Sequence, residues 1–169
     1  NVDLFSGEVY TFEMFKEFLR RIAHYKLNLF VPYFEDGFQF PSHPDIGADR
    51  DQMTFAEAQA LVAFGRRHHV DIVPCYDSPA HMGHTLRHKN YQHLRESANE
   101  PRYQDTINVT HPETYPLLRD LYNDLCEAFP SNYHYVSADE SLHVGGGNSK
   151  EALDVVGSAL NVYWTNIGD

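Results

Sequence analysis

Basic residues are scarce in this chain of 169 residues, because 13 Lys and Arg stand against 24 Asp and Glu, which gives a formal net charge of -11. A phosphate backbone is bound by clustered Lys and Arg, so this balance argues against a nucleic-acid partner and favours neutral or cationic ligands. The chain has no run of about 18 apolar residues and no signal-peptide pattern, so we expect no membrane-spanning segment and no membrane partner. It starts at Asn1 rather than at methionine. We therefore expect it to have been cut from a longer protein, and its location is undetermined.

Cysteine and tryptophan are rare as well. Cys75 and Cys126 are far apart in segments that we expect to be buried, which favours two core thiols over a disulfide and leaves the redox compartment open. The single tryptophan, Trp164, falls in a predicted helix and is expected to pack in the core. Apolar residues make up 42% of the chain and aromatic residues 14%, enough for one globular domain with a core.

Apolar periodicity predicts four strands, each followed by a helix. The strands are expected near 2–5, 27–34, 70–76 and 133–138, and the helices near 11–25, 54–69, 110–129 and 151–167. The run 27–34 is almost continuously apolar, which is typical of a strand covered on both faces. Pro32 and Pro74 lie inside two of these strands and lack an N–H, so we expect irregular pairing there, and Pro116 indicates a shifted start of the third helix. Residues 77 to about 110 show no sustained period and are predicted to form a long functional or mobile loop.

Strands that alternate with helices predict an α/β fold with a parallel sheet and right-handed crossovers. Four such units are half of a (β/α)8 TIM barrel, although a doubly wound sheet satisfies the same pattern. Acidic or histidine-bearing ends follow three consecutive strands, and a barrel gathers all of these ends at one mouth. We therefore expect residues 1–169 to form a single partial domain, the N-terminal half of a barrel, since neither an internal repeat nor a linker is present.

The strand near 133–138 runs into two adjacent carboxylates, Asp139 and Glu140, and then into a glycine-rich loop ending at Gly147. Ligands bind at the carboxyl ends of parallel strands, so an acid pair placed there is a candidate site. Taken alone, an Asp-Glu pair more often caps or solvates a loop. Glu35 and Asp36 end the second strand and carry the same ambiguity. The three glycines before Asn148 lack the Lys-Ser/Thr of a phosphate-binding loop, so flexibility is expected of them.

Several segments together resemble one known family. They are Lys26-Leu27-Asn28, Glu35-Asp36-Gly37, Val73 to His81, Ile107 to Tyr115, and Val136 to Glu140. In order and spacing they resemble the catalytic barrel of the family 20 glycoside hydrolases, the β-N-acetylhexosaminidases, over almost the whole chain. The loop from Leu142 to Gly147 looks most like the divergent bacterial branch of that family.

The resemblance implies a retaining, substrate-assisted glycosidase that needs no cofactor or metal and acts on glycans with N-acetylhexosamine. By that resemblance, Glu140 is the general acid and base, and Asp139 holds the 2-acetamido group of the sugar. Asp36 and His81 would form a chain that tunes Glu140, and Asp77 would have a supporting role. Adjacent strand residues cannot flank one bond at the roughly 5 Å that an enzyme nucleophile requires, and participation of the substrate removes that requirement.

The sequence departs from the family pattern at Ala80 and Ala138, where most members have glycine. The first-strand arginine is absent from the chain, and the later tyrosine and tryptophan positions lie beyond Asp169. A non-catalytic carbohydrate-binding or structural fragment therefore remains the alternative. A metal site for deacetylation, suggested by His81, His84 and His88, is a remote third reading. Half a barrel also leaves strand edges uncovered, which favours self-association or pairing with the missing half.

Overall fold

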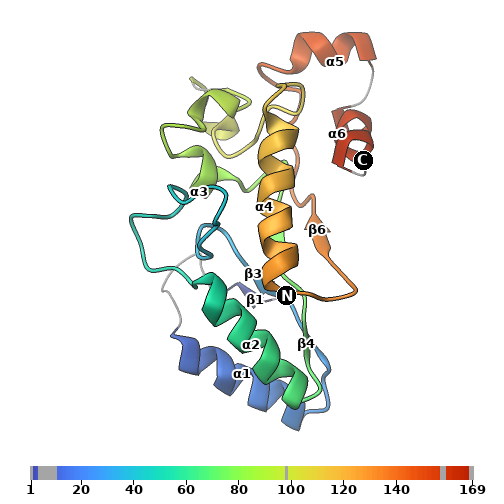
Figure 1. Cartoon of the computed structure of the whole chain (residues 1–169). Coiled ribbons are helices and arrows are strands. Elements are labelled where there is room, and N and C mark those ends of the chain that lie inside the picture. Colours follow the sequence, from blue (N-terminus) through green and yellow to red (C-terminus); the bar gives the residue numbers. More distant parts are fainter. Residues whose placement is uncertain (1, 4–10, 98, 157–158, 168–169) are drawn as a thin grey trace. The chain divides into compact units, whose positions relative to one another are not determined.

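The computed structural model describes residues 2–3, 11–97, 99–156 and 159–167 (Figure 1). Within these ranges the chain divides into two compact units. Unit 1 comprises Asn1–Tyr76 and Tyr122–Val136, and unit 2 comprises Asp77–Leu121 and Ser137–Asp169.

Unit 1 is built on two small sheets of very short strands. Across the first sheet the order is β1 (Val2–Asp3), β3 (Pro32–Tyr33), β5 (Cys75–Asp77) and β6 (Tyr135–Ser137). The second sheet consists of β2 (Leu29–Phe30) and β4 (Asp71–Ile72), which pair in parallel. β1 pairs with β3, and β3 with β5, also in parallel. The predicted parallel pairing is thus confirmed for these strands, while Leu4 and Phe5 of the first predicted strand lie outside the described residues.

Two of the predicted strands are interrupted at or beside a proline, as expected: Pro32 is the first residue of β3, and Pro74 lies between β4 and β5. Segment 27–34 forms β2 and β3, and segment 70–76 forms β4 and most of β5, with Val73 and Pro74 between them. Proline has no N–H to donate, so a hydrogen-bonded ladder does not continue through it. Each of these two segments therefore contributes one short strand to each sheet.

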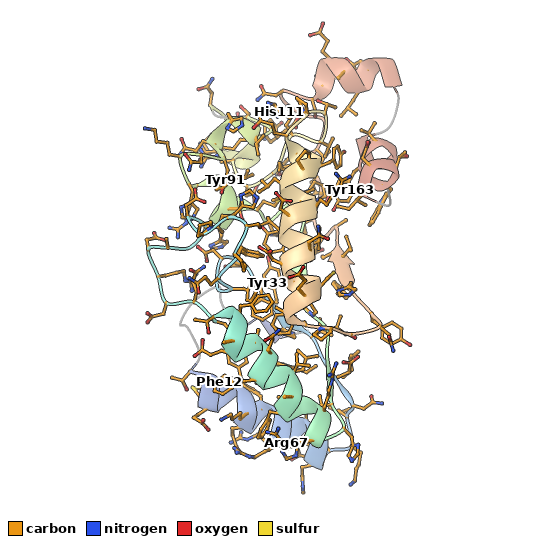
Figure 2. All side chains as sticks on the ribbon, viewed as in Figure 1. Phe12, Tyr33, Arg67, Tyr91, His111 and Tyr163 are labelled. Atoms are coloured by element: carbon orange, nitrogen blue, oxygen red, sulfur yellow. The ribbon has the colours of Figure 1, made fainter. Side chains whose placement is uncertain are left out.

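Helices α1 (Phe12–His24) and α2 (Phe55–Arg67) follow the sequence prediction and pack against each other (Figure 1). Thr11 caps α1 by accepting a hydrogen bond from Met14 N. Thr54 caps α2 in a complete capping box, in which Glu57 Oε2 accepts from Thr54 N at 2.8 Å. Their buried faces are formed by Phe15 and Leu19 of α1 and by Ala58, Leu61, Val62 and Phe64 of α2. Figure 2 labels Phe12 and Arg67, the first residue of α1 and the last of α2.

An aromatic cluster forms much of the core of unit 1. Its members are Phe34, Phe38, Phe40, Tyr76 and Phe129. The ring centroids of contacting members lie between 5.1 and 6.0 Å apart, within the range that aromatic pairs prefer. Phe34 and Phe38 flank Glu35 and Asp36 in the sequence. The cluster therefore anchors the segment that carries these two acids.

Large apolar side chains of the strands are nevertheless exposed. Leu29 of β2 is 49% exposed, and Tyr135 and Val136 of β6 are 46% and 37% exposed. The prediction that segment 27–34 is covered on both faces is wrong for the face that carries Leu27 and Leu29. No described residue buries these two side chains.

Unit 2 begins with the predicted long loop, which is more structured than expected. It contains three short helical segments, α3 (Gly83–Leu86), η1 (Gln92–Leu94) and η2 (Pro101–Tyr103). Each spans three or four residues, about one helical turn, so no apolar period can develop along it.

The helices that follow differ from prediction in their bounds. Helix α4 (Thr114–Ala128) starts later than expected and so places Pro116 in its first turn, where proline is tolerated. Segment 151–167 holds two helices, α5 (Lys150–Val156) and α6 (Ala159–Ile167), and residues 157–158 between them lie outside the described ranges. Of the described helices, none is long and apolar enough to cross a bilayer.

Two neighbouring aromatic residues of α6 differ in burial. Tyr163, labelled in Figure 2, is fully buried, and its hydroxyl donates to the backbone oxygen of Ser78 at 2.9 Å. Trp164 is 48% exposed, so the predicted packing of this residue in the core is wrong. Its neighbour Tyr163 takes the buried position on this helix instead.

Both cysteines carry free thiols. Cys75 is buried as predicted, whereas Cys126 of α4 is only partly buried. Partial burial raises the pKa of the Cys126 thiol above its ordinary value, because the thiolate loses hydration.

Candidate active site

Unit 2 brings His81 and Glu140 together. His81 follows β5 and Glu140 follows β6, and His81 Nε2 lies 3.5 Å from Glu140 Oε2. The Nε2 atom is buried and makes no hydrogen bond within the described part of the chain. The Glu140 carboxylate lies at the edge of hydrogen-bond distance from this atom. An imidazole in this place can exchange a proton with the carboxyl group or hold it in one orientation.

Both residues have left-handed backbones, with φ of 56° at His81 and 44° at Glu140. This conformation is uncommon outside glycine and costs on the order of 1–3 kcal/mol per residue, so it persists only where the surrounding structure fixes it. Residues strained in this way cluster at active sites. The pair therefore combines a chemical contact with a local conformational cost.

The acid pair lies in a turn beyond the end of β6, rather than on the strand. Leu142 N donates to Glu140 O, and the Ser141 hydroxyl donates to Ala138 O at 2.9 Å. Asp139 N donates to Ser137 Oγ at 3.3 Å, and the Asp139 side chain is exposed. The rule that neighbouring strand residues point to opposite faces thus does not apply to Asp139 and Glu140, because β6 ends at Ser137.

Unit 1 carries two of the predicted acids, Asp36 and Glu35. Asp36 is fully buried, and its Oδ1 accepts a hydrogen bond from Arg50 Nη1 at 2.8 Å. Gln52 Nε2 donates to the backbone oxygen of Asp36 at 2.7 Å, and Glu35 is also buried. The sequence interpretation missed Arg50, and the one available signal was a lone basic residue in the loop after the second strand. The link from Asp36 to His81 stays a prediction, because the two residues belong to different units.

A sequence model of the family described as "Glycosyl hydrolase family 20, catalytic domain" matches residues 6–157. That match covers most of the chain. The chain belongs to glycosyl hydrolase family 20.

Curated relatives of this family 20 chain include enzymes from an insect and a mammal. The chain is 28% identical over 159 residues to the chitooligosaccharidolytic beta-N-acetylglucosaminidase of Ostrinia furnacalis, covering 85% of the chain and 25% of that protein. It is 23% identical over 117 residues to hexosaminidase D of Bos taurus, covering 69% of the chain and 33% of that protein. The chain therefore spans about a quarter to a third of the length of these relatives. Its assignment to a bacterial branch stays an expectation.

Solved structures support the fold. The exo beta-N-acetylglucosaminidase of Vibrio harveyi, in complex with N-acetylglucosamine, matches 92% of the chain and 30% of its own length with a TM-score of 0.77 at 21% identity. The beta-N-acetylhexosaminidase of Streptomyces coelicolor matches 82% of the chain and 32% of its own length with a TM-score of 0.70 at 22% identity. These neighbours imply that the chain has the fold of a TIM-barrel catalytic domain.

Two further residues of the family motifs lie in unit 2. Asp77, at the end of β5, is buried, which fits its predicted supporting role without testing it. The Tyr115 hydroxyl donates to Val109 O at 2.8 Å, and burial raises the pKa of Tyr115. Tyr115 therefore holds the backbone at Val109, and the carboxyl group of Asp77 is largely shielded from solvent.

Three side chains of unit 2 have ligand atoms within 4.8 Å of one another, namely His93, His111 and Glu113. His93 Nε2 lies 3.0 Å from Glu113 Oε2, and His111 Nδ1 accepts from Glu113 N at 3.2 Å. His111 is labelled in Figure 2. An exposed His-Glu pair and a turn at the start of α4 account for these contacts. The spacing argument for His81, His84 and His88 fails, because α3 spans only Gly83–Leu86 and cannot carry all three on one helix face.

Proposed function

We propose that this family 20 chain belongs to a glycoside hydrolase that removes terminal N-acetylhexosamine with retention of configuration. Family membership supports the reaction class, and the relatives named above are hexosaminidases or glucosaminidases by description. The observation that carries the proposal is the 3.5 Å contact between His81 Nε2 and Glu140 Oε2, made by two residues with left-handed backbones.

In the first step, the carboxyl group of Glu140 donates its proton to the glycosidic oxygen. The carbonyl oxygen of the substrate's 2-acetamido group attacks the anomeric carbon, the glycosidic bond breaks, and the aglycone leaves as an alcohol. Asp139 holds the amide N–H and balances the positive charge of the cyclic intermediate. His81 orients the Glu140 carboxyl group through its buried Nε2 atom.

In the second step, Glu140 is a carboxylate and accepts a proton from water. That water attacks the anomeric carbon, the ring formed with the acetamido group opens, and the sugar is released with its original configuration. Glu140 regains its proton and the acetamido group is restored. The turn after β6 is compatible with these two roles, proton transfer by Glu140 and binding of the acetamido group by Asp139, since the two carboxyl groups need not lie on opposite sides of one bond.

We further propose that residues 1–169 are a single partial domain, the N-terminal half of a (β/α)8 barrel. Both units fall largely within the one family match, residues 6–157. Strand β6 is the last in the sheet order and exposes Tyr135 and Val136. A following barrel strand would pair with this edge and cover these side chains. On this proposal the chain alone is inactive, and activity belongs to the polypeptide with the complete barrel.

The test uses the complete polypeptide with an aryl N-acetyl-β-glucosaminide. Glu140→Gln removes the transferable proton, so kcat for a substrate with a poor leaving group should fall by on the order of 10²–10⁴. Glu127→Gln, which changes an exposed glutamate of α4, is the matched control and should leave kcat unchanged. A thiazoline mimic of the cyclic intermediate should inhibit competitively.

Equal turnover of the corresponding 2-hydroxy glucoside would refute participation of the acetamido group. A protein that binds the glycan without any turnover would support the non-catalytic alternative, which family membership does not favour. Gluco or galacto specificity follows from the same assay with the two epimeric substrates.

A further inference from the structure

Glu96 is a fully buried acid in unit 2 that the proposed reaction does not use. Its Oε1 atom accepts three hydrogen bonds, from Gly147 N at 2.8 Å, from Ser149 N at 3.2 Å and from Ser149 Oγ at 2.7 Å. The other oxygen, Oε2, is buried and has no hydrogen-bond partner among the described residues. All the bonds of this carboxyl group therefore go to one segment, the glycine-rich loop that follows Asp139 and Glu140.

The backbone strengthens the same attachment. Asn148 N donates to Glu96 O at 2.7 Å, and Asn148 Nδ2 donates to Arg95 O at 3.1 Å. A Cβ atom at Gly147 would lie 2.3 Å from Glu96 O, so only glycine permits this approach. The glycines that the sequence suggested to be flexible thus include one that is needed for close contact.

The segment that carries Glu96 also reaches His81. Glu96 N donates to Thr106 O at 2.8 Å, which joins Glu96 to the segment 105–107. Ile107 N donates to Pro79 O at 2.8 Å, and Met82 N donates to Asp105 O at 2.8 Å. These two bonds lie on either side of His81. Glu96 is therefore connected by short hydrogen bonds both to the loop after Glu140 and to the backbone around His81.

We propose that Glu96 is the positioning residue of the His81–Glu140 pair. Its buried carboxyl group holds the loop at 147–149 on the segment that supports His81, and so keeps Glu140 Oε2 beside His81 Nε2. This inference rests on the proposed function, because the position of Glu140 matters only if Glu140 delivers a proton. Glu96 touches no substrate atom in this scheme.

The decisive readout is the dependence of activity on the leaving group. A misplaced general acid slows cleavage of a poor leaving group, such as a methyl aglycone, far more than that of 2,4-dinitrophenolate, which departs without protonation. In the complete polypeptide, Glu96→Ala should lower kcat/KM for the methyl glycoside by on the order of 10- to 100-fold. It should lower kcat/KM for the dinitrophenyl glycoside, which reports only the cleavage step, by less than about threefold; kcat for that substrate can fall further, because Glu140 is also the base of the second step.

Glu96→Gln is the rescue variant. Its amide oxygen can accept the three bonds made by Oε1, and the position of Oε2 receives no bond that would be lost. Activity within about threefold of the natural protein is therefore expected for both substrates. Glu100→Ala is the matched control, since Glu100 lies on the same segment but pairs with Arg102 at the surface, and it should change neither rate.

Ser149→Ala provides a milder test if Glu96→Ala does not fold. It removes one of the three bonds to Oε1 and should show the same selective loss, smaller in size. An equal loss of kcat/KM for both leaving groups, no loss at all, or failure of Glu96→Gln to restore kcat/KM would each overturn the inference. If Glu140→Gln leaves cleavage of the methyl glycoside intact, the proposed function fails. If only Glu140→Gln shows the selective loss, the reaction stands and the role of Glu96 does not.

Discussion

At the scale of single residues, His81 has a strained backbone and a buried ring nitrogen that points at a mostly exposed carboxylate. Its φ is 56°, and the side chain of Glu140 is 70% exposed. The side chain of His81 is 34% exposed, so more of the imidazole than of the carboxylate is covered by the surrounding protein. On the proposed mechanism, the more covered imidazole orients the more exposed acid.

Replacing His81 by glutamine should therefore impair proton delivery without removing Glu140. In the complete polypeptide we expect kcat for a poor leaving group to fall by about 10- to 100-fold and the pH profile of kcat to change shape. His93→Gln serves as the control, because His93 is half-exposed and pairs with Glu113 instead. An unaltered pH profile in His81→Gln would show that the contact has no part in the reaction.

A loss of activity in His93→Gln that added Zn²⁺ restores would point to a metal at His93, His111 and Glu113.

The residues of the site were predictable from sequence to different degrees. His81 and Glu140 lie in motifs that resemble the family, so their proximity followed from the resemblance. Arg50 and Glu96 lie in no motif, and their partners are 14 and 51 residues away. A contact of that kind depends on how two loops fold over each other, and no local pattern in the sequence records it.

Among the secondary-structure elements, the helices were predictable because helix propensity and capping residues mark them locally in the sequence. Helix α2 begins at a capping box in which Thr54 and Glu57 satisfy each other's backbone N–H groups. Thr54→Ala should destabilise unit 1 by about 1 kcal/mol, whereas Thr54→Ser keeps the hydroxyl and should cost only a few tenths of that. Urea unfolding followed by far-UV circular dichroism measures both. Equal midpoints for Thr54→Ala and Thr54→Ser would show that the cap contributes nothing.

The strands were harder to predict than the helices. Their apolar runs were visible, and so was the interruption at Pro32 and Pro74, because a missing N–H is a local property. The sequence did not show which strand faces are covered by other elements. Leu29 is exposed and Phe30 buried in the same two-residue strand, a difference set by the elements that pack on each side. Whether a strand face is buried depends on the elements that pack against it. The pattern of apolar residues along the strand does not show which of those elements are present.

At the scale of the whole chain, apolar surface remains uncovered. Tyr133, Tyr135 and Val136 are exposed on and beside β6, the last strand in the order of its sheet. An unpaired strand edge with exposed apolar side chains is a template for association with another chain. The net charge of -11 opposes association at long range, but it is screened beyond about 10 Å at 0.1 M salt.

Residues 1–169 alone should therefore self-associate at micromolar concentration, and more strongly as salt is raised. Sedimentation velocity across a range of protein and salt concentrations measures this. Val136→Lys places a charge on β6 and should shift the equilibrium toward monomer, because edge strands are protected from pairing in this way. Glu127→Lys, which makes a larger change in net charge at an exposed position of α4, controls for charge alone. A stable, well-folded monomer at these concentrations would mean that the edge of β6 needs no partner, and the half-barrel proposal would then lose its physical basis.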